Sequence, residues 1–444
     1  MIKNKINFFF LLICLISILS FLYTIFNSEF RTNGENREYY YKYYLISSIL
    51  FFGSIVTIFF SKIVKKYILI ITLSFFSSLY LYEFYAIFYL YGIESYKQKI
   101  NTQSKLDFYL EQKKIDKSTV IAVPNTIKDS KVEYLFPLSG VSNSNTINCN
   151  ESGYFSTYKS DRYGFNNPDS EWDSNKIDYL LIGDSFVHGA CVNRNNDIAS
   201  VIRKNTKSNV LNLGISGSGL YDYYAILREY KHKNTTKILL FYFEGNDLGD
   251  FLDKNYKNIN NQLKKYLNNN FYSQGLRFRQ KEIDNYYINL IKKNILDQSN
   301  QEIYKYNYFF NFIKLWHTRN AIKFTVLKYK EIFNKKKFNS VEFKKILNLF
   351  NNYSKNNNAE LYFVYLPALE RYRNSYNDKI FKRLEIKSAV LELKIKFIDI
   401  HEEVFLKINN PLKLFTSNSL YGKHYNIEGY ERVAKSVIKI IDQN

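Results

Sequence analysis

Three long stretches without a charged residue dominate the first hundred residues of this 444-residue chain. They are Ile6–Ser28, Tyr43–Ser61 and Tyr67–Tyr82, and the apolar pattern of the last continues past Glu83 to Gly92. A helix needs about 20 apolar residues to cross a bilayer. We therefore predict three membrane-spanning helices, over residues 6–28, 43–61 and 67–92, which together form an anchor of residues 1–99.

The first stretch also invites comparison with a secretory signal peptide. Its apolar run is longer than the core of about 7–15 residues that such a peptide has, and no small-residue cleavage site follows it. These features favour a spanning helix. Glu83 is compatible with a third span if it lies near the interface or faces another helix, and a functional role is the alternative for an ionisable residue there.

Basic residues at the ends of the stretches predict the orientation of the anchor. Lys3 and Lys5 precede the first stretch, and the short second loop carries Lys62, Lys65 and Lys66. Segments dense in Lys and Arg stay on the cytoplasmic side. We therefore expect a cytoplasmic N-terminus in a bacterial inner membrane, and a periplasmic domain that comprises residues 100–444.

The charge of the outer domain limits its partners. The chain has a formal charge of +21, of which residues 1–99 carry +5 and residues 100–444 carry +16. A basic surface attracts nucleic acid, anionic lipid or acidic polymers. Because no chromosome lies outside the membrane, we expect no nucleic acid partner. An anionic glycan or lipid is the better candidate, unless the charge reflects only a Lys- and Asn-rich composition.

The composition beyond the anchor is typical of a folded domain. Aromatic residues make up 18% of the chain, while 16 Gly, 5 Pro and 3 Cys exclude disordered, collagen-like and disulfide-scaffold classes. Short apolar runs have the length of strands: Ile177–Ile182, Asn209–Leu213, Lys237–Phe243, Glu360–Leu366 and Lys396–Ile400. Stretches with helical spacing lie between or after them: Ile198–Lys204, Tyr221–Tyr230, Val341–Tyr353 and Glu428–Ile441.

This alternation predicts an α/β fold with a parallel sheet that helices cover on both faces. We expect about five strands in a flavodoxin-like order, with ligands at the carboxyl ends of the strands. Residues 251–355 interrupt the alternation and are rich in Asn, Lys and Tyr. We interpret them as a helical insertion, either a lid or a platform for substrate.

Polar residues follow three successive predicted strands, and a histidine lies near the C-terminus. The first strand ends in Gly183–Asp184–Ser185–Phe186, and the second leads into Gly214–Ile215–Ser216–Gly217. The third ends in Gly245–Asn246–Asp247, and His424 precedes the last helix. Each motif alone is weak, and Ser185 could simply cap a helix. Their order and their placement at strand ends make the combination specific.

These motifs resemble those of the SGNH hydrolases, also called GDSL-like esterases and acetyltransferases. The resemblance covers roughly residues 145–250 and 358–444. It implies that Ser185 is the nucleophile and His424 the general base. It further implies an oxyanion hole made by the backbone N–H groups of Ser185 and Gly217 and by the side chain of Asn246.

The same residue types suit acyl transfer on chemical grounds. A serine is a weak nucleophile that needs a base within hydrogen-bond reach. The oxyanion of the tetrahedral intermediate needs fixed donors. Gly217 lets the backbone approach a substrate closely. We place Asp184 and His188 on the substrate side of the nucleophile, His188 at its mouth, and expect Asp184 and Asp247 to fix loops by accepting N–H bonds.

One position departs from the family pattern. The family has an Asp two or three residues before the histidine, where this chain has Tyr421 and Gly422. No carboxylate is therefore in sequence position to orient His424. A backbone carbonyl, or a distant acid such as Asp399 or Glu428, could replace it. A Ser–His dyad is expected to work more slowly than a triad.

The cysteines fit an oxidising compartment. Cys14 lies in the first span, whereas Cys149 and Cys191 both lie in the outer domain. We predict that these two form a disulfide, with two buried free thiols as the alternative. We expect His317 and His401 to be structural or solvated. No cluster has zinc-ligand spacing and no phosphate-binding loop is present, so we expect neither metal nor cofactor.

The sequence thus predicts a membrane-anchored periplasmic serine esterase. Its substrates would be O-acyl groups, most simply O-acetyl groups, of a cell-envelope polysaccharide or glycolipid. An O-acetyltransferase of the same fold is one alternative, and it would need an acyl-donor membrane protein as partner. A non-catalytic glycan-binding subunit of an envelope assembly system is the other, and the missing acid favours it.

Overall fold

The structure is a computed structural model that describes residues 2–31, 33–34, 37–91, 105–124, 135–232, 234–251, 260–305, 312–323, 338–373, 378–416 and 424–443. The chain divides into two compact units. The first comprises the N-terminal helices and the described segment 312–323. The second comprises the rest of the described chain and contains all the candidate site residues.

The first unit contains three long apolar helices, α1 (Ile2–Ile25), α2 (Arg37–Ile58) and α3 (Lys62–Tyr85). A π-helical turn continues α1 to Arg31 and another continues α3 to Tyr91. All three are long and apolar enough to cross a membrane. Helices α2 and α3 start six and five residues before the uncharged stretches begin, because the charged residues that precede each stretch are also helical. The predicted end of the third span, residue 92, lies outside the described residues.

Glu83 on α3 is fully buried and binds segment 312–323, one of the described parts of residues 251–355. Its carboxylate accepts hydrogen bonds from the backbone N–H groups of His317 and Thr318, at 3.0 and 2.7 Å, and from the Thr318 hydroxyl at 2.7 Å. Residues 316–323 are helical, so the carboxylate caps the start of this short helix. Glu83 therefore faces another helix, one of the two placements that the third span allows.

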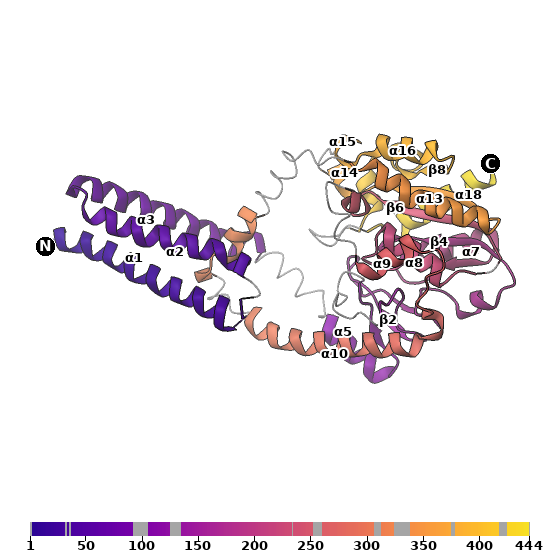
Figure 1. Cartoon of the computed structure of the whole chain (residues 1–444), viewed down its shortest axis with the longest axis horizontal. Helices are drawn as coiled ribbons and strands as arrows, with labels where there is room; N and C mark the ends of the chain where they lie inside the picture. Colours follow the sequence, from indigo (N-terminus) through magenta and orange to yellow (C-terminus); the bar gives the residue numbers. More distant parts are fainter. Residues whose placement is uncertain are drawn as a thin grey trace. The chain divides into compact units, whose positions relative to one another are not determined.

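A five-stranded parallel sheet forms the centre of the second unit (Figure 1). Its strands are β4 (Ile177–Ile182), β5 (Val210–Asn212), β6 (Thr235–Phe243), β7 (Glu360–Leu366) and β8 (Lys396–Asp399). They lie in the order β5–β4–β6–β7–β8, which is the flavodoxin-like order. All five coincide with the predicted apolar runs to within two residues. The predicted mixed α/β fold with a parallel sheet is confirmed.

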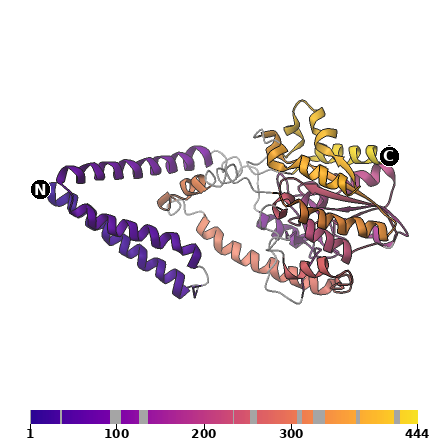
Figure 2. The same cartoon turned by 45° about the horizontal axis from the view of Figure 1, so that its top comes forward.

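Helices cover both faces of this sheet (Figures 1 and 2). The apolar side chains of α8 (Leu220–Glu229), α13 (Ser340–Asn356) and α16 (Arg383–Glu392) belong to one core. Those of α6 (Ser185–His188), α7 (Ile198–Thr206) and α18 (Ile427–Asp442) belong to the other. The short helices α14, α15 and α17 span Leu369–Arg373, Asp378–Phe381 and Ile400–Glu403. Short 3₁₀ turns span Asp169–Asp173, Asp247–Phe251, Leu276–Phe278, Phe405–Lys407 and Pro411–Leu414.

The described parts of residues 251–355, interpreted from the sequence as a helical insertion, belong to three different parts of the structure. Helix α13 lies inside this range but packs on the main sheet, as the crossover helix between β6 and β7. Helices α9 (Asn261–Asn268) and α10 (Gln280–Lys305) lie in the remainder, and segment 312–323 belongs to the first unit.

A second, smaller sheet was not predicted from the sequence. It consists of β1 (Val120–Ile121), β2 (Asn145–Ile147) and β3 (Thr157–Lys159), and helix α5 (Lys105–Ile115) precedes it. Strands β2 and β3 are antiparallel and are joined by the loop of residues 148–156. Strands of two or three residues are too short to leave a period-two pattern in the sequence.

Candidate active site

Ser185 begins helix α6 directly after the carboxyl end of β4. Asp184 is the N-cap of this helix, and its carboxylate accepts a hydrogen bond from the Phe186 N–H at 2.9 Å. A carboxylate at this position satisfies a backbone donor that the helix leaves free. The Ser185 side chain is partly exposed while its neighbours on both sides are buried. The Ser185 hydroxyl thus lies at the carboxyl end of the parallel sheet, on a turn that the Asp184 cap fixes.

Side chains from three other segments bind the carbonyl end of α6. Asn212 donates to the Val187 carbonyl at 2.7 Å, Asn166 to the His188 carbonyl at 2.9 Å, and Tyr430 to the Ala190 carbonyl at 3.0 Å. A helix of four residues is not stable by itself, and these bonds satisfy the acceptors that its end would otherwise leave unpaired. The position of Ser185 is therefore held from both ends of its helix.

His424 lies just before α18 and meets Ser185 as predicted. Its Nε2 is 2.9 Å from the Ser185 Oγ, although the two residues are 239 positions apart. The local chain is fixed by Asn426, the N-cap of α18, which accepts from the Gly429 N–H at 2.9 Å. The base is thus within hydrogen-bond reach of the nucleophile, which is the geometric requirement for general-base activation.

A glutamate that the sequence reading missed orients this histidine. Glu151, in the loop between β2 and β3, places Oε1 2.9 Å from Nδ1 of His424. Its Oε2 accepts from the His424 backbone N–H at 3.1 Å and from the Thr416 hydroxyl at 2.9 Å. Because Nδ1 faces a carboxylate, the ring proton resides there and Nε2 is left free to accept from Ser185. Ser185, His424 and Glu151 form a complete Ser–His–Glu arrangement.

A distant acid therefore orients His424, which is one of the alternatives that the sequence leaves open, but the acid is Glu151. Neither of the two distant acids considered takes the role. Asp399 pairs with Arg383 at 2.6 Å, and Glu428 pairs with Arg432 at 2.7 Å. The positions Tyr421 and Gly422 lie outside the described residues.

The environment of Glu151 keeps its carboxyl ionised. Burial by itself raises the pKa of this group, but the hydrogen bond and charge of His424 outweigh burial and lower the pKa to about 2. The side chains of Glu151 and His424 are each less than one-fifth exposed. The carboxylate is therefore charged at neutral pH and accepts from three donors.

The three groups assigned to the oxyanion hole lie on the loops that follow β4, β5 and β6. Gly217 has φ 76°, a conformation that is unfavourable for a residue with a side chain. Asn246 is exposed, and its Nδ2 donates to the Asp184 Oδ2 at 3.1 Å. Gly214 packs so closely on α6 that an added Cβ would lie 2.4 Å from the His188 nitrogen. The β5 loop is thus pressed against the helix that carries the nucleophile.

Asp184 and His188 are both buried and hydrogen-bonded within the protein. The two ring nitrogens of His188 lie 2.8 Å from the Ser216 hydroxyl and 2.7 Å from the Tyr158 hydroxyl. Burial, and then the nearby His424, lowers the pKa of His188 to about 4, so its ring is neutral at pH 7. In this structure Asp184 and His188 support the loops around Ser185, and neither presents a free polar group to a substrate.

The predicted disulfide between Cys149 and Cys191 is present, and Cys14 is a free thiol. Cys191 follows the nucleophile by six residues and Cys149 precedes Glu151 by two. Among the described residues, Cys149, Cys191 and His424 also gather as potential metal ligands, but the two sulfur atoms are bonded to each other.

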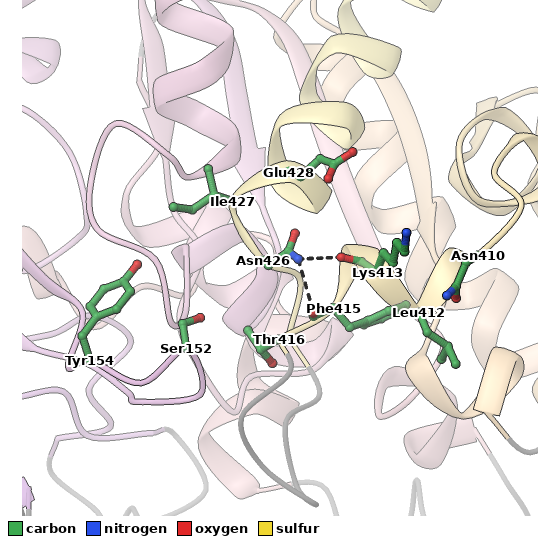
Figure 3. Close-up of a pocket in the computed structure, with 10 residues that line it drawn as sticks. All are labelled: Ser152, Tyr154, Asn410, Leu412, Lys413, Phe415, Thr416, Asn426, Ile427 and Glu428. Atoms are coloured by element: carbon green, nitrogen blue, oxygen red, sulfur yellow. Dashed lines mark hydrogen bonds between the residues drawn. The ribbon is translucent and has the colours of Figure 1, made fainter. Parts of the chain in front are cut away.

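An open groove is lined by residues that neighbour Glu151 and His424 in the sequence, among them Ser152 and Asn426 (Figure 3). Its volume is about 710 Å³, and its lining includes Ser152, next to Glu151, and Thr416, which donates to Glu151. Asn426, Lys413 and Tyr154 supply amide, ammonium and aromatic groups to its wall. The lining is about equally polar and apolar, since Leu412, Phe415 and Ile427 also contribute to it.

No protein-family model matches the chain, and no curated protein matches it. Two solved structures resemble it in fold. One is a protein assigned to the G-D-S-L lipolytic family from Desulfitobacterium hafniense, with 14% identity and a TM-score of 0.31 over 60% of this chain and 99% of that one. The other is a protein from Lactobacillus plantarum, with 11% identity and a TM-score of 0.32 over 61% and 99%.

Proposed function

We propose that this protein is a membrane-anchored serine esterase of the SGNH type that removes O-acyl groups from a cell-envelope polysaccharide or glycolipid. The observation that carries the proposal is the chain of contacts from Ser185 through His424 to Glu151, with 2.9 Å at each step. A nucleophile, a base and an acid that orients the base are the three parts that acyl transfer from serine needs.

The proposed reaction has two halves. Ser185 Oγ attacks the ester carbonyl while its proton moves to His424 Nε2, and the alcohol leaves with that proton. Water then attacks the acyl-enzyme, His424 accepts the proton of the water, and the carboxylic acid is released as Ser185 is restored. Glu151 stabilises the imidazolium in both halves. The N–H groups of Ser185 and Gly217 and the Asn246 amide would hold the oxyanion.

Three features support a sugar-bearing substrate. The groove of Figure 3, whose lining includes Asn410, Ser152 and Tyr154, offers amide, hydroxyl and aromatic groups, the combination that can bind hydroxyl groups and the apolar face of a sugar ring. Residues 100–444 carry a net charge of +16, which suits an anionic polymer. The three apolar helices would keep the enzyme at the membrane, next to envelope glycans and glycolipids.

The contact of Glu151 with His424 bears on the two alternative functions, a glycan-binding subunit and an O-acetyltransferase. A non-catalytic glycan-binding subunit was favoured by the missing acid, and Glu151 removes that support. An O-acetyltransferase would use the same acyl-enzyme, with a sugar hydroxyl in place of water, and it would need a separate acyl donor.

The test uses the full-length protein in detergent with an O-acetylated polysaccharide. We expect acetate release that Ser185→Ala lowers by at least about 10³-fold. The matched control is Ser200→Ala, which alters a serine that binds Asp197 on helix α7. If the acetyl group appears on an added glycan acceptor instead of as acetate, the transferase is correct. If wild type and Ser185→Ala release acetate equally slowly, the enzyme proposal is wrong.

A further inference from the structure

The loop that carries Glu151 is separate from the main sheet. It connects β2 and β3, and its base is closed by hydrogen bonds from Asn148 N–H to the Ser156 carbonyl and from Ser156 N–H to the Cys149 carbonyl, at 2.8 and 3.0 Å. Ser185, by contrast, follows the carboxyl end of β4 in the main sheet, and His424 lies in the C-terminal segment just before α18. Glu151 therefore comes from a loop of the small three-stranded sheet. A contact between this loop and the main sheet must fix the position of Glu151 relative to Ser185 and His424.

The Cys149–Cys191 disulfide makes this connection. Cys149 lies two residues before Glu151, and Cys191 follows the helix on which Ser185 lies. Cys191 is fully buried, and its Sγ is 3.6 Å from Nδ1 of His424, the nitrogen that faces Glu151. The bridge therefore covalently joins the segment of the acid to the segment of the nucleophile, in contact with the base between them.

The backbone at Cys191 supports a special role for this position. Its φ is 64°, in the left-handed region that a residue with a side chain seldom adopts. Such a conformation persists where the surroundings determine it, and it concentrates at functional sites. The loop has further, non-covalent attachments: Glu151 accepts hydrogen bonds from His424 and Thr416, and the Phe155 ring stacks on Phe108. At the start of β3, the Thr157 N–H donates to the Asn193 side chain at 2.9 Å.

We propose that Cys149 and Cys191 are positioning residues, whose disulfide holds Glu151 against His424 and so sets the rate of acyl transfer. The inference depends on the proposed esterase function. Opening the bridge frees the loop of the acid but leaves Ser185 and His424 in contact, so the enzyme becomes a slower Ser–His dyad. Activity should therefore follow the redox state of this one bond.

A double-mutant cycle in the full-length protein tests this role. The four proteins are wild type, Cys149→Ser with Cys191→Ser, Glu151→Gln, and the combination of all three changes. We expect loss of the bridge to lower kcat about tenfold or more in wild type, with KM changed less than twofold. In the Glu151→Gln background the same loss should change kcat less than twofold, because the acid is already gone. Equal losses of kcat in both backgrounds would show that the disulfide stabilises the fold in general and does not act through Glu151. That result would overturn the inference.

Reversible reduction keeps the test valid if the cysteine variants do not fold. Dithiothreitol converts the bridge to two thiols and is itself oxidised to its cyclic disulfide. We expect activity to fall as two alkylatable thiols appear in the Cys14→Ser protein, and to return on reoxidation. Unchanged activity in the fully reduced, folded protein would overturn the inference.

Reaction with a fluorophosphonate separates the two proposals. Wild-type protein that never reacts at Ser185 would contradict the esterase proposal itself. Wild-type protein that reacts, while bridge-free protein reacts at the same rate and turns over equally fast, would contradict only the role of the disulfide.

Discussion

At the scale of single residues, the site depends on one carboxylate that receives three hydrogen bonds. The Glu151 oxygens accept from the His424 ring, the His424 backbone and the Thr416 hydroxyl. One side chain therefore fixes both the tautomer of the imidazole and the chain position of the histidine. This dual contact explains how an acid from a separate loop can replace one next to the histidine in sequence.

The first prediction concerns this carboxylate. Glu151→Gln keeps the size of the side chain but removes its charge and favours the wrong tautomer of His424. We expect kcat to fall by about 10²–10⁴-fold, as loss of the acid does in serine proteases. Ester hydrolysis by purified protein is the measurement, with Glu431→Gln as control, because Glu431 is an exposed residue of α18 that pairs with Lys435. A loss of less than threefold would mean that Glu151 does not orient the base.

The second prediction concerns stability below neutral pH. The pKa of buried His188 is lowered to about 4, so the unfolded chain binds a proton there at a higher pH than the folded chain does. Its contribution is complete above about pH 6.5 and is lost as the pH falls towards 4. We expect His188→Gln to flatten the fall of the melting temperature in this window. Buried His401, with a pKa of about 4, would leave a residual slope. An unchanged slope would contradict the account.

Sequence alone could identify Ser185 and His424, because each lies next to a strand end or helix start that the local pattern marks. It could not identify Glu151, since nothing local distinguishes this glutamate from the others. One indirect signal was available. The predicted bridge joins Cys149, two residues before Glu151, to Cys191, six residues after the nucleophile. If Cys149 is bonded to Cys191, then Glu151, two residues from Cys149, must lie close to the segment that contains Ser185.

At the scale of elements, the proposed oxyanion hole would be formed by segments that follow three neighbouring parallel strands. Asn246 after β6 bonds to Asp184 after β4, and Gly214 after β5 packs on α6. These contacts join the loops after β5 and β6 to the segment after β4 that contains Ser185. They also hold the loops in place before any substrate binds.

The third prediction tests one of these donors. Asn246→Ala should lower kcat by about 10²–10³-fold, the loss found when an oxyanion-hole amide is removed elsewhere, with little change in KM. Steady-state kinetics with a small acyl ester is the measurement. Asn205→Ala is the control, since Asn205 only bonds to a carbonyl within its own helix α7. If KM rises while kcat is unchanged, Asn246 binds the ground state and the oxyanion role is wrong.

The fourth prediction concerns the contact between α3 and segment 312–323. Glu83→Ala leaves two backbone N–H groups and the Thr318 hydroxyl without their carboxylate partner. Hydrogen bonds to a charged group contribute roughly 1.5–3 kcal/mol each, so we expect amide exchange at His317 and Thr318 to accelerate by tenfold or more. Exposed Glu38 on α2 provides the control variant Glu38→Ala. Unchanged exchange would show that the carboxylate does not hold this segment.

The main sheet was predictable because its central strands β4, β6 and β7 each contain a run of apolar residues that is buried in the structure. The small sheet was not, because β1 to β3 have two or three residues each. Helix α13 has a clear apolar face, but it lies within an Asn- and Lys-rich region whose composition suggested an insertion. The helical spacing over Val341–Tyr353 was predicted, but the composition concealed that this helix packs on the main sheet.

At the scale of the whole molecule, the chain combines an apolar helical unit with an α/β unit that contains the site. The 46% hydrophobic content is an average over these two unlike parts. We propose that the second unit lies outside the cytoplasm, where a disulfide is stable and an envelope glycan is within reach.

The fifth prediction tests this orientation. Protease added to spheroplasts should digest the α/β unit and leave a membrane-protected N-terminal fragment, whereas inverted membrane vesicles should protect the α/β unit. Immunoblotting for a C-terminal tag is the measurement, and a cytoplasmic enzyme is the control for intact membranes. Protection in spheroplasts would place the site in the cytoplasm and contradict the proposed substrate.

The central claim is that Ser185 is a nucleophile activated by His424 and Glu151. The most direct measurement is the intact mass of the full-length protein after reaction with a fluorophosphonate, followed by peptide mapping. The account predicts one adduct, on Ser185, that is absent in Ser185→Ala and forms at least about tenfold more slowly in His424→Ala and Glu151→Gln. Absence of an adduct in wild type, or equal labelling of all four proteins, would contradict it.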